Sequence, residues 1–262
     1  MLQTPGLITA DELSCTESTS AQQHLLRGSF RYYHYGNDSF ADHGWGCGYR
    51  TVQCMLSWLA PSPPPPIPQL QEVLLRTHAA AFPGVRGWIG VNDAVVLLDA
   101  LHGAAVQVLT VSSGAEAIEL FPKLAEHFDA GGGPVMVGSG GDPYSKTLVG
   151  VRIDQPAVLV LDPHYSGPSL RTCDEAESLK ALWDGGWIAW KDPATCFPST
   201  SFYNFGLAAM QPGKAQGAQV LAPTSRAAAR SDEGGWAHLF EVVGRGERES
   251  AVATSNAVPS DL

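Results

Sequence analysis

Residues 43–53 read HGWGCGYRTVQ and place Cys47 between two glycines. Within and after this segment, apolar residues recur at helical spacing, namely Val52, Met55, Leu56 and Leu59. The spacing predicts a helix over residues 47–59 that begins at the cysteine. A helix N-terminus offers unpaired N–H groups and a partial positive charge, which favour a thiolate and can stabilise an oxyanion. The glycines would let a substrate backbone approach closely. Cys47 is therefore a candidate nucleophile, and the alternative is an ordinary small buried residue.

A second informative segment, residues 158–167, reads VLVLDPHYSG. A strand predicted over residues 157–161 leads into Asp162 and His164, which lie two apart and so face the same side of an extended chain. Pro163 suits the end of a strand because it cannot donate a ladder hydrogen bond. His164 could serve a thiol as general base, with Asp162 orienting the imidazole. The alternative is a turn that Asp-Pro starts and the histidine caps.

Together the two segments supply a nucleophile, a base and an orienting carboxylate from different elements, which is the generalised triad arrangement. His43 is a rival base, but it is too close to Cys47 in sequence for easy geometry. The remaining histidines and cysteines lack paired spacing, so no metal site is expected. The glycine-rich stretches lack a GxxxxGK pattern, which disfavours phosphate binding.

Helical patterns fill the first half of the chain, over residues 47–59, 69–81, from 92 or 93 to 101, and 115–128. Asn92 or Asp93 could cap the third of these helices. Short apolar runs predict strands in the second half, over residues 134–137, 147–153, 157–161, 187–190 and 202–208, after one early strand over residues 30–35. Helices first and strands second predict an α+β fold with an antiparallel or mixed sheet.

The composition divides the chain into three parts. Residues 1–27 are weakly patterned and rich in Ser, Thr and Gln, so a flexible lead is expected there. Residues 28–212 carry the helices, the strands and both candidate segments, and form the expected catalytic domain. Residues 213–262 are of low complexity, which predicts a mostly disordered tail.

The charge and apolar content exclude several classes of partner. Of the 262 residues, 26 are acidic and 16 are Lys or Arg, which gives a net charge of −10. An acidic chain without a basic cluster disfavours nucleic acid and anionic membranes as partners. No run approaches 18 apolar residues and the N-terminus lacks a basic start, so neither membrane insertion nor a secretory signal is expected.

The chain has five cysteines, which are Cys15, Cys47, Cys54, Cys173 and Cys196. This odd number, without a C-x-x-C pair, does not suggest a disulfide framework. Reduced thiols predict a protein of the cytoplasm, with the nucleus as a further compartment.

Five stretches in order resemble the ubiquitin-fold modifier-specific proteases, in their short form. They are GWGCGYR at residues 44–50, WIG at 88–90, PVMVGSGGDPYSKTLVGV at 134–151, DPHY at 162–165 and SFYN at 201–204. The resemblance extends over about residues 30–210. It implies a papain-like cysteine protease fold without a metal or cofactor.

The resemblance also implies the roles of four residues. Cys47, His164 and Asp162 match the family's catalytic triad, and Tyr35 in YHYG matches a tyrosine that stabilises the oxyanion. From the sequence alone, Tyr35 would be a packing residue like its neighbours. Trp45 and Trp88 are predicted to wall a narrow groove for a glycine-ended tail, with core packing as the alternative for at least one of them.

The expected protein is thus a monomeric thiol protease. It would cleave after the C-terminal glycine of the ubiquitin-fold modifier, maturing its precursor, releasing it from conjugated targets, or both. One alternative is an autophagin-like protease for a lipid-conjugated ubiquitin-like modifier. Another is a catalytically idle module that binds the modifier without cutting it.

Overall fold

The computed structural model describes residues 7–9, 12–13, 22–78, 83–167 and 175–209 of the chain. The predicted tail at 213–262 and much of the predicted lead at 1–27 lie outside the described residues, so the domain boundaries stay predictions. Within the described ranges, no helix is both long and apolar enough to cross a membrane.

Three helices follow one another in the first half of the chain: α2 (Cys47–Leu59), α3 (Ile67–His78) and α4 (Val91–His102). α2 has the predicted bounds. α3 begins two residues earlier than predicted, because Pro68 is tolerated in a first turn, where its missing N–H is not needed. The predicted caps of α4 are wrong. Gly90 is the N-cap, and Asp93 lies inside the first turn, where its carboxylate accepts the Gly90 N–H at 2.8 Å.

The helix predicted over residues 115–128 consists of two elements. These are the 3-10 helix η2 (Gly114–Leu120) and the α-helix α5 (Phe121–Asp129). Pro122 explains the break, because it has no N–H to bond to the carbonyl of Ile118 one turn earlier.

Five strands overlap those predicted for the second half: β5 (Val135–Ser139), β6 (Lys146–Arg152), β7 (Ala157–Leu161), β8 (Ile188–Lys191) and β9 (Tyr203–Ala209). β7 has the predicted bounds. β4 (Ala105–Val111) was not predicted, because most of its residues are exposed or half-buried and leave no clear apolar alternation. The strand predicted over residues 30–35 is wrong in length, since β3 covers only Ser29–Arg31.

Four further short elements were not predicted. β1 (Leu7–Thr9) pairs with β3 and β2 (Gln23–Leu25) pairs with β6, in the region for which composition predicted a flexible lead. Strands of three residues are too short to produce a periodic signal. The helices α6 (Glu175–Asp184) and α7 (Pro193–Cys196) flank β8 in sequence.

The main sheet has the strand order β4-β9-β5-β6-β7-β8, with β2 added on β6, and every pairing in it is antiparallel. Met136 of β5 is opposite Gly206 of β9 and Thr147 of β6. Helices before an antiparallel sheet confirm the predicted α+β class.

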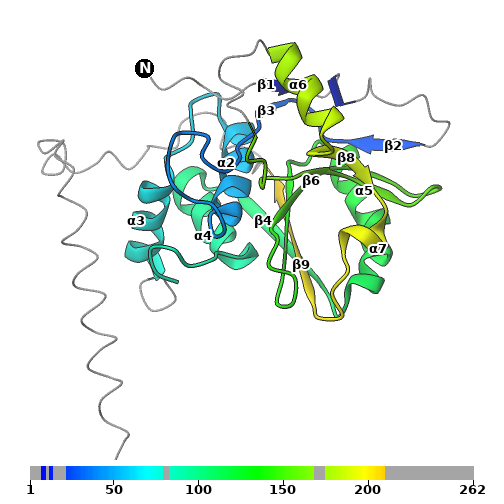
Figure 1. Ribbon diagram of the computed structural model, residues 1–262. Coiled ribbons are helices and arrows are strands. Elements are labelled where there is room, and N and C mark those ends of the chain that lie inside the picture. The colour runs from blue at the N-terminus through cyan, green and yellow to red at the C-terminus, as the bar shows by residue number, and fades with distance from the viewer. Residues whose placement is uncertain (1–6, 10–11, 14–21, 79–82, 168–174, 210–262) are drawn as a thin grey trace, which may run out of the picture. The chain divides into compact units, whose positions relative to one another are not determined.

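The sheet separates two hydrophobic cores. Val135 and Val137 of β5 face a core that includes residues of α5, whereas Met136 between them belongs to a core with α2, α3 and α4. This alternation is the two-residue period of a strand buried on both faces. Figure 1 shows α2, α3 and α4 gathered on one side of the sheet, and α5 and α7 on the other. The first turn of α2 therefore lies where the helical part of the chain meets the sheet.

Candidate active site

Cys47 is the first residue of α2 and is only 5% exposed. The neighbouring glycines are required by close packing within the protein. A Cβ atom on Gly46 would lie 2.5 Å from the side chain of Asp42, and one on Gly48 would lie 2.6 Å from the carbonyl oxygen of Ile89. Gly46 and Gly48 thus have a packing role within this chain, and their role in the approach of a substrate backbone stays a prediction.

Asp162 and His164 follow the end of β7, and they contact each other as predicted from their spacing. Asp162 Oδ1 accepts hydrogen bonds from His164 Nδ1 at 2.6 Å and from the backbone N–H of His164 at 3.0 Å. The backbone N–H of Asp162 donates to the carbonyl of Trp187 at 2.8 Å. On the neighbouring strand β8, the ammonium of Lys191 lies 3.6 Å from Asp162 Oδ2. Contacts at its backbone N–H and at both carboxylate oxygens thus fix the position of Asp162.

Cys47 and His164 form an acid–base pair. Burial opposes ionisation of the Cys47 thiol, but hydrogen bonds from the His164 side chain and the Ser145 backbone outweigh it and lower the thiol pKa. Burial likewise opposes the protonated form of His164, but Asp162 and Cys47 outweigh it and raise its pKa to about 9. These opposite changes favour a thiolate beside an imidazolium at neutral pH.

Tyr35 lies against both members of this pair. Its side chain is hydrogen-bonded to Cys47, and its ring meets that of His164 edge-on, with 5.2 Å between the ring centroids. Its backbone N–H donates to the carbonyl of Pro163 at 3.0 Å, which ties it to the segment carrying the histidine. Burial and the neighbouring Cys47 raise the pKa of Tyr35, so its hydroxyl stays a donor. His43 packs against the ring of Tyr35 at 5.2 Å, while the hydrogen bond to Cys47 comes from His164.

Cys47 borders a groove of about 250 Å³. Trp88, 57% exposed, lines the groove, and its indole N–H donates to the carbonyl of Gly44 at 3.0 Å. Trp45, in contrast, is 7% exposed and packs between Phe40 and Tyr49, with 5.9 Å between ring centroids on each side. The structure therefore places Trp88 at the groove and Trp45 in the core. The prediction that Trp45 walls the groove is wrong.

A buried arginine that the sequence reasoning missed fixes the loop between Tyr35 and α2. Arg50 is fully buried, and its guanidinium bonds to Asp42 Oδ2 and Asp38 Oδ1, each at 2.7 Å. Asp42 Oδ1 also accepts the backbone N–H of Gly36 at 2.8 Å. In the sequence, an arginine on a helix is typical of a solvent-exposed face, and only the two upstream aspartates hint at a buried ion pair.

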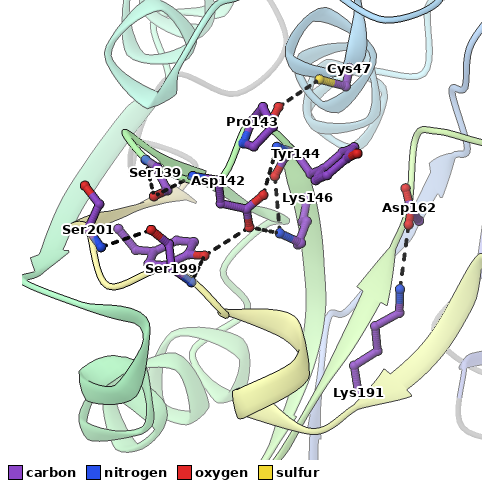
Figure 2. A network of polar contacts seen from close by, with 12 residues as sticks. Cys47, Ser139, Asp142, Pro143, Tyr144, Lys146, Asp162, Lys191, Ser199 and Ser201 are labelled. Carbon is purple, nitrogen blue, oxygen red and sulfur yellow. Dashed lines mark hydrogen bonds and ion pairs between the residues drawn. The ribbon is translucent and has the colours of Figure 1, made fainter.

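The β5–β6 loop was also missed as a part of the site. Its Pro143 carbonyl lies 3.9 Å from the Cys47 sulfur, and Figure 2 shows the thiol directed towards it. The ring of Tyr144 meets the His164 ring edge-on at 5.0 Å. Nothing in the local sequence pattern indicates these contacts, because they join residues about 20 to 100 positions apart.

A cysteine at the start of a helix, a histidine and an aspartate beyond the end of a strand, and a groove beside the thiol define a papain-like thiol protease. The match with known proteins agrees with this class. Residues 21–206 match peptidase family C78, and the chain belongs to that family.

Named relatives support the family assignment. The chain is 39% identical over 188 residues to mouse Ufm1-specific protease 1, which covers 69% of this chain and 83% of the relative. It is 35% identical to the Ufm1-specific protease of Caenorhabditis elegans and to chicken Ufm1-specific protease 2, but it spans only 31% and 40% of these longer proteins.

A solved structure confirms the expected fold. The crystal structure of UfSP from C. elegans superposes with a TM-score of 0.65 at 32% identity, over 78% of this chain and 38% of that one. The papain-like α+β fold inferred from the sequence resemblance is therefore confirmed.

Proposed function

We propose that this chain is a thiol protease that processes Ufm1, the ubiquitin-fold modifier, by cleaving after its C-terminal glycine. The observation that carries the proposal is that Asp162 holds the His164 ring at 2.6 Å, and that His164 in turn lowers the pKa of the Cys47 thiol, in a member of peptidase family C78. The relatives named above act on Ufm1 according to their names, which supports the choice of modifier.

In the proposed reaction, the Cys47 thiolate attacks the carbonyl carbon of the terminal glycine. The hydroxyl of Tyr35 and the backbone N–H of Cys47 stabilise the oxyanion of the tetrahedral intermediate. The His164 imidazolium protonates the leaving amine, and a thioester forms. His164 then takes a proton from water, which attacks the thioester and releases the modifier with a free glycine carboxylate.

The same steps serve two substrates, because the leaving amine can be the α-amine of a precursor extension or the ε-amine of a target lysine. Asp162 keeps the His164 ring oriented in both halves of the reaction. The chain needs no cofactor for these steps, since the thiol, the base and the oxyanion donors are its own.

The groove supports a substrate with a slender end. Its volume of about 250 Å³ lies below the range of roughly 300–1,000 Å³ that is usual for small-molecule sites. Trp88 forms an exposed apolar wall beside Cys47, against which a glycine-ended tail can lie. We therefore propose Trp88 as the substrate-contacting tryptophan.

The two alternative functions have less support. The relatives named above carry the name of Ufm1, and none of them supports an autophagin-like protease acting on a lipid-conjugated modifier. The contact of Asp162 with the His164 ring at 2.6 Å and the packing of Tyr35 against the same ring argue against an idle binding module, in which these residues need not be aligned. A monomeric state and a location in the cytoplasm or nucleus stay predictions.

Cleavage of a Ufm1 fusion with a C-terminal extension tests the proposal. The wild-type chain should release the extension after the modifier's glycine, whereas Cys47→Ser and His164→Ala should bind the fusion without cutting it. Cys54→Ser is a matched control, because it removes a second thiol of the same helix and should leave cleavage intact. Cleavage by Cys47→Ser would refute the nucleophile. Cleavage of an autophagin-type precursor instead of the Ufm1 fusion would refute the substrate.

A further inference from the structure

The β5–β6 loop, residues 140–145, touches both catalytic partners from the sheet side. The Pro143 carbonyl lies 3.9 Å from the Cys47 sulfur, and the Ser145 hydroxyl donates to the hydroxyl of Thr51 on α2 at 3.2 Å. The Ser145 backbone also lowers the pKa of the Cys47 thiol. Between them, the ring of Tyr144 packs edge-on against His164. Three consecutive residues thus fix the thiol and the imidazole, although none of them takes part in bond making.

One buried carboxylate holds this loop in place. Asp142 is 6% exposed, and its Oδ1 accepts the backbone N–H of Tyr144 at 3.0 Å. Its Oδ2 accepts from the Lys146 ammonium at 2.5 Å and from the hydroxyl of Tyr203 at 3.0 Å. Figure 2 shows these contacts converging on Asp142, on the opposite side of Pro143 from Cys47. The carboxylate therefore joins the loop to β6 and β9.

The same carboxylate also reaches the segment before β9. The hydroxyl of Tyr203 accepts the backbone N–H of Ser199 at 3.2 Å while it donates to Asp142. This segment carries Phe202, which is 45% exposed, lines the groove and packs over Gly140. Both loops that form the sheet side of the groove are thus fastened at Asp142.

We propose that Asp142 is a positioning residue of the protease, whose carboxylate fixes the β5–β6 loop so that Ser145 and Tyr144 hold Cys47 and His164 in their reactive arrangement. The proposal rests on the proposed thiol protease function and adds a residue that lines the groove and acts on Cys47 and His164 through the loop. Because the carboxylate is fastened by three donors from three residues, its loss would loosen the loop at several points together.

The charges around the Asp142 carboxylate agree with this positioning role. Burial opposes ionisation of Asp142, but Lys146 and the Tyr144 N–H outweigh it and lower its pKa, so it is a carboxylate at working pH. The other titratable groups beside it are Tyr203 and Cys196, whose pKa values burial raises to about 12 and about 11, so both are neutral there.

The groups that face the Cys47 thiol differ from those that surround Asp142. Cys47 is met by His164 from the end of β7 and by Tyr35 from the loop before α2, besides the backbone of Ser145. Asp142 is not among these groups, so a change at Asp142 should reach the sulfur through the position of the loop.

The test is Asp142→Asn, which keeps the size of the side chain but has one accepting oxygen in place of two. It therefore cannot accept from the Tyr144 N–H at one position and from Lys146 and Tyr203 at the other. Two readouts are compared with wild type, the pH dependence of Cys47 alkylation by iodoacetamide, and kcat and KM for a Ufm1 fusion. We expect the thiol pKa to rise by about one unit, which lowers alkylation below that pKa about tenfold. We expect kcat to fall by a similar factor, with a smaller change in KM.

Two further variants keep the test decisive. Tyr203→Phe removes a single hydrogen bond to Asp142 and should change both readouts in the same direction by a smaller factor. Asp129→Asn is the matched control. Asp129 on α5 pairs with His24 on β2, so its substitution should leave both readouts unchanged. If Asp142→Asn fails to fold, the alkylation profile and kcat of Tyr203→Phe decide whether the proposal holds.

Wild-type alkylation profiles in both Asp142→Asn and Tyr203→Phe would overturn the proposal. Alkylation does not involve the modifier, so it separates the two hypotheses. A chain that leaves the Ufm1 fusion uncut would refute the proposed function, while slower alkylation in Asp142→Asn would still support the positioning role.

Discussion

Replacing Asp162 with asparagine would remove the charge that stabilises protonated His164 while keeping a side chain of the same size. Asparagine Oδ1 can still accept the hydrogen bonds that Asp162 Oδ1 receives from the His164 ring at 2.6 Å and from its backbone at 3.0 Å. The ring should therefore stay oriented, and the lost interaction is mainly that of the carboxylate with the imidazolium.

The size of this loss follows from the pKa of His164. Its rise from 6.5 to about 9 corresponds to roughly 3 kcal/mol in favour of the protonated ring. Asp162 and Cys47 both contribute to this rise, each by a hydrogen bond and by its charge. Because burial opposes the protonated ring, these two groups together contribute more than the net rise, and removing the Asp162 charge should lower the pKa of His164 by at least about one unit.

We expect a bell-shaped pH profile of kcat/KM in wild type and a narrower bell in Asp162→Asn. Activity rises with pH as the Cys47 thiol ionises, and it falls near pH 9 as His164 loses its proton. In Asp162→Asn, the basic limb should move about one unit lower, and kcat/KM near that limb should fall about tenfold. The acidic limb should move slightly higher, because the thiolate faces a weaker imidazolium. The two limbs report the pair, not either group alone.

The assay is cleavage of a Ufm1 fusion by wild type and Asp162→Asn across the range in which both groups titrate. Asp184→Asn is a control, because it breaks only an exposed ion pair with Lys180 on α6. A basic limb that stays near pH 9 in Asp162→Asn, with kcat/KM unchanged, would refute the reasoning. It would mean that the charge of Asp162 does not set the protonation of His164.

Three further substitutions have expected outcomes. Arg50→Met leaves the buried carboxylate of Asp42 without its partner, so urea unfolding should give a loss of about 3–5 kcal/mol, and a loss below about 1 kcal/mol would contradict a buried ion pair. Gly48→Ala places a methyl group against the carbonyl of Ile89, which should cost about 1–3 kcal/mol in the same measurement and slow alkylation of Cys47; a stable chain with normal alkylation would show that α2 can shift freely. Trp88→Ala removes an exposed side chain with one hydrogen bond to Gly44, so it should cost at most about 1 kcal/mol of stability, yet raise KM for the Ufm1 fusion; an unchanged KM would remove Trp88 from the substrate site.

The sequence sufficed for the elements that carry the nucleophile and the base. α2 was predictable because its apolar residues recur at helical spacing, and β7 because a continuous apolar run ends at an Asp-Pro step. Both catalytic residues lie at an end of a regular element, where local patterns are informative. β4 was missed for the converse reason, since an edge strand that is largely exposed has no apolar face to recognise.

Residues outside regular elements could not be assigned in this way. Trp45 and Trp88 each lie beside glycine, and neither sits in a periodic pattern that would separate core from surface. Their exposures differ because Trp45 packs between two rings of its own neighbourhood, whereas Trp88 is fixed by one hydrogen bond to Gly44. These contacts depend on how the loop before α2 folds, and a sequence pattern does not record that.

Tyr35 makes the same point for catalysis. Three tyrosines, Tyr32, Tyr33 and Tyr35, are all buried and share one short segment, so composition cannot rank them. The backbone hydrogen bond from Tyr35 to Pro163 brings the Tyr35 ring to His164, and it joins residues more than a hundred positions apart. The chemistry of a nucleophile and its base can be read locally because each needs a particular residue type. Apart from Asp162, whose role follows from its spacing to His164, the groups that position them are ordinary residues. These acquire their role only from the long-range hydrogen bonds that position the loops.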